Sequence, residues 1–185
     1  MQSSGPHLHA DFPSDERDQR SYLAWMQLWL AHCNRALQDG APVMLFTEWR
    51  QLLLTPDALQ CACLTWRGGT DKADDARPQR GSFSNQAKHV IQGSKDGMPL
   101  GLAAPSLPGV FREAIRKADK HHLTGKPTDL MRKLVRICEQ GGRILYPFVG
   151  SGTSLVAADA EGYSWTGIEM TGCYFEVAGP RLSTP

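Results

Sequence analysis

The sequence contains no uninterrupted apolar run that could cross a membrane as a helix, which takes about 18 residues or more. The first residues, MQSSGPHLHADFP, also lack the apolar core of a secretory signal. These two absences predict a protein that neither spans a membrane nor is secreted.

Cysteine is scarce and scattered, with five residues in a chain of 185. Only Cys61 and Cys63 lie close together, and no second pair or histidine cluster completes a zinc site with them. His121 and His122 have no acid or thiol at ligand spacing, so a loop or capping position is favoured for them. We therefore expect reduced cysteines, no bound metal and a cytoplasmic protein.

The net charge is only +1, so total charge does not indicate a protein that binds nucleic acid. Cations are nevertheless concentrated in residues 112–136, against few acids. Two interpretations stay open for this segment, a solvated helix face or contacts to DNA phosphates. The cations are Arg112, Arg116, Lys117, Lys120, Lys126, Arg132, Lys133 and Arg136.

The apolar content of 41% is enough for one ordinary core, and no internal repeat is evident, so the chain is expected to form a single domain. Residues 18–37 predict a long amphipathic helix, with Trp25 and Trp29 in its apolar stripe. These tryptophans are interpreted as core residues, with stacking on DNA bases as the alternative. The segments that follow predict a strand at 42–46, a helix at 52–61 and strands at 64–67 and 88–92.

Residues 68–86 are polar and rich in Gly, Asp, Arg and Pro, which predicts a loop. Arg77 and Arg80 are candidates for DNA contact in this loop, and a plain solvated loop is the alternative. Residues 94–109 predict a linker. Short helices are predicted at 111–120 and 128–138.

The most informative stretch is residues 141–169, GGRILYPFVGSGTSLVAADAEGYSWTGIE. It predicts a strand at 143–146, a glycine loop at 150–153, a helix at 154–161 and a second strand at 164–168. This order is typical of a cofactor-binding turn in an open α/β sheet.

Gly150 and Gly152 permit positive φ angles and close approach of the backbone to a ligand. The helix that begins near Thr153 points free N–H groups at any electron-rich group placed there. Glu169 follows the second strand, where a carboxylate meets the hydroxyls of a bound ribose. The spacing is not the GxGxxG dinucleotide fingerprint, and a simple strand-to-helix turn is the alternative.

The segment YPFVGSGTSLVAA, followed by GIE, YFEVA and RL, resembles the cofactor-binding signature of amino-methylating DNA methyltransferases, DPFxGSGTT with a later GIE strand. Upstream, the stretches DQRSYLAWMQLWL, FTEWRQL, TWRG and HVIQGSK resemble successive parts of the same enzymes in the same order. The resemblance implies an α/β, Rossmann-like methyltransferase fold with S-adenosylmethionine as cofactor.

The resemblance also implies the cofactor site. A Thr-x-Lys-Pro segment of the family matches Lys126 and Pro127, which are expected beside the methionine part of the cofactor. Tyr146 stands where the family usually has Asp, and a neutral phenol cannot replace that charge at the cofactor's ammonium group, so weaker binding is expected. The expected cofactor-binding residues are Lys126, Pro127, Tyr146, Pro147, Phe148, Gly150, Ser151, Gly152, Thr153 and Glu169.

The reaction that the resemblance implies is methyl transfer to adenine N6 or cytosine N4 of double-stranded DNA, with the base flipped out of the duplex. The family holds the target amine with an Asp or Asn followed by Pro-Pro and an aromatic residue, and this sequence has no such motif. No catalytic residue is therefore assigned. Because Ser3, Ser4 and Gly5 resemble the stretch after that motif, the chain is expected to begin just after it.

The strand that carries the absent motif would lie in the middle of the sheet. We expect an incomplete sheet in which residues 42–46 pair directly with 143–146, or in which another chain or segment fills the gap. The domain is expected to comprise a partial catalytic and target half at 1–93, a linker at 94–110 and a cofactor-binding half at 111–185.

Three functional classes follow. The first is a DNA methyltransferase relative that is active in a larger assembly and weakly active or inactive alone. The second is a degenerate, non-catalytic module that binds DNA or a protein partner. The third is an unrelated nucleotide-binding α/β domain.

Overall fold

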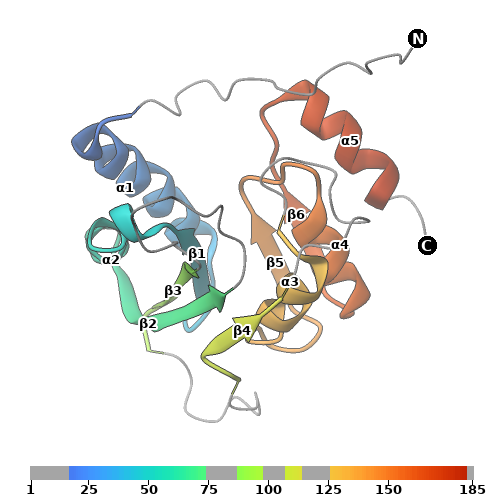
Figure 1. The fold of residues 1–185 in the computed structure, drawn as a ribbon, viewed down its shortest axis with the longest axis horizontal. Coiled ribbons are helices and arrows are strands. Elements are labelled where there is room, and N and C mark those ends of the chain that lie inside the picture. The colour runs from blue at the N-terminus through green and yellow to red at the C-terminus, as the bar shows by residue number, and fades with distance from the viewer. Residues whose placement is uncertain (1–16, 74–86, 98–106, 114–125, 183–185) are drawn as a thin grey trace, which may run out of the picture.

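The computed structural model describes residues 17–73, 87–97, 107–113 and 126–182. Figure 1 shows β1 to β4 with α1 and α2 on one side of the molecule, and β5 and β6 with α3 to α5 on the other. In chain order the elements are α1 (Gln19–Ala36), β1 (Pro42–Thr47), the 3-10 helix η1 (Trp49–Gln51), α2 (Leu54–Cys61), β2 (Leu64–Ala73), β3 (Ala87–Lys95), β4 (Val110–Arg112), α3 (Thr128–Val135), β5 (Arg143–Tyr146), α4 (Thr153–Ala160), β6 (Ser164–Gly167) and α5 (Gly172–Leu182).

The strands form two sheets. The first has the order β1-β3-β2-β4, and the second pairs β5 with β6. Strand β3 is antiparallel to β1 and β2, whereas β4 is parallel to β2 and β6 is parallel to β5. The α/β fold class is confirmed, with the parallel β5–α4–β6 unit that the glycine-rich stretch predicts.

Helix α1 and helix α2 cover one face of the first sheet. Asp18 caps α1, because its side chain accepts hydrogen bonds from the backbone N–H groups of Arg20 at 2.8 Å and Ser21 at 3.1 Å. Trp25 and Trp29 are partly buried and pack against the core under α1, so their interpretation as core residues is confirmed. The buried members of this first cluster are Met26, Leu30, Ala58, Leu59, Ala62, Leu64 and Ile91.

A second apolar cluster connects the two sheets. It contains Val90 of β3 and Ala157 of α4, and the side chains of Phe46 and Tyr146 pack against it from β1 and β5. Its other buried members are Phe111, Leu130, Met131 and Leu134. The core of the molecule therefore continues from the first sheet through α3 to the glycine-loop unit.

The expected direct pairing of residues 42–46 with 143–146 is wrong. Strand β1 pairs with β3, and β5 pairs with β6. Among the described residues, no strand lies on the second edge of either β1 or β5. The physical reason is that Phe46 and Tyr146 both point side chains into the second cluster, which holds the two strands together by packing rather than by backbone hydrogen bonds.

Two other local expectations are corrected. The predicted loop at 68–86 is wrong for its first residues, because β2 continues to Ala73 and pairs with β3 along its length. The predicted helix at 111–120 is wrong at its start, because Phe111 and Arg112 belong to β4. In β2, pairing with β3 overrides the weak strand propensity of glycine and polar residues. In β4, Val110 and Phe111 have high strand propensity and pair with β2.

Within the described ranges, no helix has the length and apolar character needed to cross a membrane. All five cysteine thiols are free. Among the same residues, His, Cys, Asp and Glu side chains form no group that could hold a metal ion.

Candidate cofactor site

The glycine loop connects the end of β5 to the start of α4. The backbone continues the strand pairing as far as Val149, whose N–H donates to the carbonyl of Ile168 at 3.0 Å. The N–H of Gly152 then donates back to the carbonyl of Val149 at 3.0 Å and closes a tight turn. Gly150 and Gly152 have φ angles of +55° and +82°, a region that favours glycine.

Glu169 closes the loop from the side of β6. Its Oε2 accepts a hydrogen bond from the backbone N–H of Gly150 at 2.7 Å, and its Oε1 accepts one from the N–H of Thr171 at 2.8 Å. The sequence predicts a role for this carboxylate at a ribose, and the structure adds a role in holding the loop. A carboxylate has about four acceptor positions, so two hydrogen bonds to the backbone leave capacity for ligand hydroxyls.

The start of α4 is buried. Ser151, Thr153 and Ser154 are each at most 6% exposed, and Gly152 precedes the helix as its N-cap without a side-chain cap. Helix α5 packs directly behind the loop, because a Cβ added to Gly152 would lie 3.1 Å from the Cβ of Ala178. The loop can therefore present backbone N–H groups on one side only, away from α5.

Tyr146 is the last residue of β5 and packs against the clusters on both sides of it. Ser154, in the first turn of α4, interacts with its side chain and partly offsets the effect of burial on the pKa of Tyr146. Burial raises the pKa of Tyr146 above its ordinary value, so the side chain is a neutral phenol at physiological pH. This position therefore carries no negative charge.

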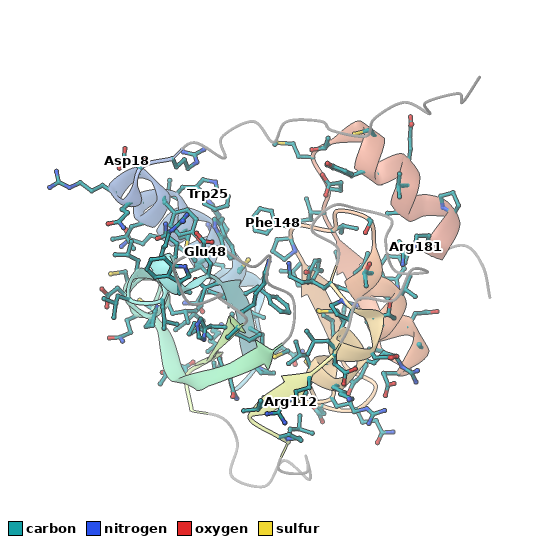
Figure 2. The ribbon with its side chains drawn as sticks, viewed as in Figure 1. Asp18, Trp25, Glu48, Arg112, Phe148 and Arg181 are labelled. Atoms are coloured by element: carbon teal, nitrogen blue, oxygen red, sulfur yellow. The ribbon has the colours of Figure 1, made fainter. Side chains whose placement is uncertain are left out.

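Phe148 connects the glycine loop to α1, a contact that the sequence does not predict. Its ring centroid lies 5.0 Å from that of Trp29 in an edge-to-face arrangement and 5.7 Å from that of Trp25. Figure 2 shows Trp25 and Phe148 facing each other between the two sides of the molecule. The indole N–H of Trp29 is buried and has no hydrogen-bond partner in the described ranges. The sequence signal for this contact is limited to an aromatic residue two positions after the end of β5.

Lys126 and Pro127 lie at the start of α3. Pro127 is fully buried and is the N-cap residue of that helix. The ammonium group of Lys126 lies 5.1 Å from the ring centroid of Phe46, within the range of a cation–π contact. Phe46 packs against the same apolar cluster as Tyr146, the last residue of β5.

The expected cofactor-binding residues thus fall into two groups. In the first group, the glycine loop follows the end of β5 in the chain, and Glu169 accepts a hydrogen bond from the Gly150 N–H in that loop. The pair Lys126 and Pro127 is linked to them through the apolar cluster that contains Phe46 and Tyr146.

Three cations of the basic segment are engaged in ion pairs. Arg132 and Arg136 both donate to the carboxylate of Glu161, at 2.7 and 2.8 Å, and Lys133 pairs with Glu113. The hydrogen bond from Arg136 lowers the pKa of Glu161. These pairs favour the interpretation of the α3 cations as a helix face, because their charges are locally compensated.

The main candidates for DNA contact are Arg77, Arg80, Arg112, Arg116 and Lys117, and of these five only Arg112 lies in the described ranges. It is exposed on β4 and lines a pocket of about 370 Å³ with Lys133 and Arg136. Figure 2 shows Arg112 well away from Phe148 and the glycine loop. Arg77, Arg80, Arg116 and Lys117 lie outside the described residues.

Solved structures share this fold. M1.HpyAVI in complex with SAM is 19% identical, with a TM-score of 0.76 over 91% of this chain and 85% of the other. The cytosine-N4-specific PvuII DNA methyltransferase is 14% identical, with a TM-score of 0.76 over 100% of this chain and 78% of the other. TTHA0409 from Thermus thermophilus, complexed with S-adenosyl-L-methionine, is 17% identical, with a TM-score of 0.71 over 89% of this chain and 77% of the other.

A sequence model of the N6/N4 DNA methylase family matches residues 82–179, which is more than half of the chain. The match includes the glycine loop, Glu169 and most of α5. An unrelated nucleotide-binding domain is thereby excluded. Sequence, fold and the architecture of the loop agree, and the chain belongs to the N6/N4 DNA methylase family.

Proposed function

We propose that the chain binds S-adenosylmethionine at the glycine loop. The observation that supports this most is the hydrogen bond from the Gly150 N–H to Glu169, which joins the glycine loop to the carboxylate that follows β6. Two solved proteins with this fold are complexes with the same cofactor. The bound cofactor supplies an electrophilic methyl group.

The residues of the loop have separate roles in this proposal. Glu169 accepts hydrogen bonds from the ribose hydroxyls with its remaining lone pairs. The start of α4 directs backbone N–H groups at the ligand. Phe148 supplies an apolar face at the mouth of the site. The remaining proposed contacts are Lys126, Pro127, Tyr146, Pro147, Ser151, Gly152 and Thr153.

The proposed reaction is methyl transfer to an exocyclic amino group of double-stranded DNA, at adenine N6 or cytosine N4. The target base must leave the duplex to reach the site. The sequence offers no Asp/Asn-Pro-Pro-aromatic motif to hold the target amine, and Tyr146 places no charge at the cofactor's ammonium group. We therefore expect weak or no methyl transfer by the isolated chain.

The proposed location is the cytoplasm, because free cysteine thiols are typical of proteins in its reducing environment.

A second polypeptide supplies the missing strand in this proposal. The second edges of β1 and β5 carry unpaired backbone groups among the described residues, and both strands border the same apolar cluster. In β1, Val43 and Leu45 pack against one cluster while Met44 and Phe46 pack against the other, so a strand beside it would be covered on both faces. An apolar strand of about five residues fits such a position.

The second candidate function is a non-catalytic module that binds DNA or a protein partner. The absent motif and the neutral Tyr146 favour it over catalysis by the isolated chain. Exposed Arg112 at the 370 Å³ pocket is its one described candidate for a phosphate contact. Retention of DNA by the purified chain that disappears at raised salt would support this function.

The test combines binding with methyl transfer. Thermal unfolding of the chain is followed with S-adenosylmethionine and, as a control, with NAD, and only the former is expected to raise the Tm. Transfer of a labelled methyl group to unmethylated duplex DNA is then measured with the chain alone and with a polypeptide that carries an apolar strand followed by the absent motif. Transfer only in the mixture supports the assembly, whereas cofactor binding without transfer in either case supports the non-catalytic module.

A further inference from the structure

Arg181, in the last turn of α5, contacts the glycine loop from behind. Its Nη1 donates hydrogen bonds to the backbone carbonyl of Ser151 and to Oγ1 of Thr153, the latter at 3.3 Å. Ser151 lies in the connection between β5 and α4, and Thr153 is the first residue of α4. Figure 2 shows Arg181 on α5, on the side of the loop away from α1.

The bond to Ser151 fixes the orientation of a peptide group in the turn. A trans peptide is planar, so its C=O and N–H point in opposite directions. When the Ser151 carbonyl is held toward Arg181, the Gly152 N–H must point away from α5, and it donates to the Val149 carbonyl at 3.0 Å. The guanidinium is therefore coupled to the hydrogen bond that closes the loop.

Two other contacts hold the glycine loop at positions other than the Ser151 peptide group. Glu169 holds the N–H of Gly150 from the side of β6, and Ala178 lies against Gly152. The hydrogen bond that the Ser151 carbonyl accepts comes from Arg181. Because the bond to Arg181 involves a charged donor, it is stronger than a bond between neutral groups.

We infer that Arg181 is a positioning residue that sets the shape of the glycine loop for its ligand. The inference rests on the proposed function, because the ligand of that loop is taken to be S-adenosylmethionine. Arg181 itself lies behind the loop and acts through the Ser151 peptide and Thr153. One nitrogen makes both contacts, so the three protons of a lysine ammonium group can satisfy the same acceptors.

The test is hydrogen exchange of backbone amides in the ligand-free chain. Arg181→Met is expected to speed exchange of the Gly152 amide at least about tenfold while the Val90 amide of β3 is unchanged. Arg181→Lys is expected to restore most of the protection. Arg143→Met, which removes an exposed arginine from the neighbouring β5, is the matched control and should change neither amide.

Cofactor affinity is the second readout, because a residue that only stabilises the fold would not change it selectively. Arg181→Met is expected to weaken S-adenosylmethionine binding at least about tenfold, with recovery in Arg181→Lys. If Arg181→Met does not fold, Thr153→Val removes one acceptor of Arg181 and should speed exchange of the Gly152 amide by a smaller factor in the ligand-free chain.

The outcomes separate the two proposals. Faster Gly152 exchange in Arg181→Met, in a chain that binds no cofactor, supports the positioning role and contradicts the proposed function. Unchanged Gly152 exchange, or equal acceleration at Val90, overturns the positioning role even when the wild-type chain binds the cofactor.

Discussion

The backbone N–H of Gly150 lies 2.7 Å from Oε2 of Glu169, so the carboxylate that follows β6 closes the loop that follows β5. The second carboxylate oxygen accepts the N–H of Thr171 at 2.8 Å. One side chain thus connects the ends of both parallel strands, and its charge strengthens each hydrogen bond. The cofactor site depends on this connection.

Glu169→Gln is expected to weaken S-adenosylmethionine binding at least about tenfold, because the amide group cannot accept a hydrogen bond on both sides. The free energy of unfolding should fall by about 1–3 kcal/mol for the same reason. Calorimetric titration and urea unfolding measure the two effects. Glu176→Gln, on the exposed side of α5, is the matched control and should change neither quantity. Equal affinities in both variants would contradict this role of Glu169.

Tyr146→Asp is expected to tighten cofactor binding by more than about tenfold, or roughly 1.4 kcal/mol, because it adds a negative charge for the ammonium group of the ligand. The structure adds a cost: Tyr146 packs against two apolar clusters, so unfolding free energy should fall by about 3 kcal/mol. Tyr146→Asn has nearly the same shape as Tyr146→Asp without the charge. Tighter binding in the Asp variant than in the Asn variant, measured by titration, is the expected result, and equal affinities would refute the role of charge.

Gly152→Ala is expected to destabilise the chain more than Gly162→Ala. Both glycines have φ near +80°, so both substitutions carry backbone strain of about 1 kcal/mol. Only at Gly152 would the new Cβ lie 3.1 Å from Ala178, which adds about 1–3 kcal/mol of overpacking. Urea unfolding of the two variants isolates this contact. Equal losses of stability would mean that α5 does not press on the loop.

Glu161→Gln is expected to lower the free energy of unfolding by about 1 kcal/mol at pH 7, because Arg132 and Arg136 both lose their charged partner. The hydrogen bond from Arg136 lowers the pKa of Glu161 in the folded chain. A carboxyl group with a lowered pKa contributes its full stabilisation when the pH is above its ordinary pKa of about 4.3. This contribution disappears as the pH falls through the lower pKa of the folded chain.

Urea unfolding across pH checks this prediction. The difference in unfolding free energy between wild type and Glu161→Gln should be full at neutral pH and should disappear as the pH falls through the lowered pKa of Glu161. The exposed Glu176→Gln again serves as the control, with no such pH dependence. A difference that stays constant as the pH falls through the acid range would show that packing of the side chain, rather than its charge, is responsible.

The sequence predicts the glycine-loop unit well because its signals are local. Strand β5 has the predicted bounds, and α4 begins one residue before the predicted start. Positive φ angles at Gly150 and Gly152 follow from the same pattern. The stripe that contains Trp25 and Trp29 predicts α1 for the same reason, since burial recurs at helical spacing.

The remaining features depend on contacts between distant segments. Strand β2 continues through Gly68 and Gly69 because β3 pairs with it, although both glycines have low strand propensity. Helix α5 continues through Pro180, a residue that disfavours a helix interior, and packs on the loop through Ala178. No local pattern links Phe148 to Trp29, so their contact becomes visible only in the folded chain.

The central claim is that the glycine loop and Glu169 form a working pocket for S-adenosylmethionine. Calorimetric titration of the purified 185-residue chain with this cofactor tests it most directly. The account predicts saturable binding with a Kd in the micromolar range, about −8 kcal/mol, that weakens in Glu169→Gln. No detectable heat from a chain that circular dichroism shows to be folded would contradict it.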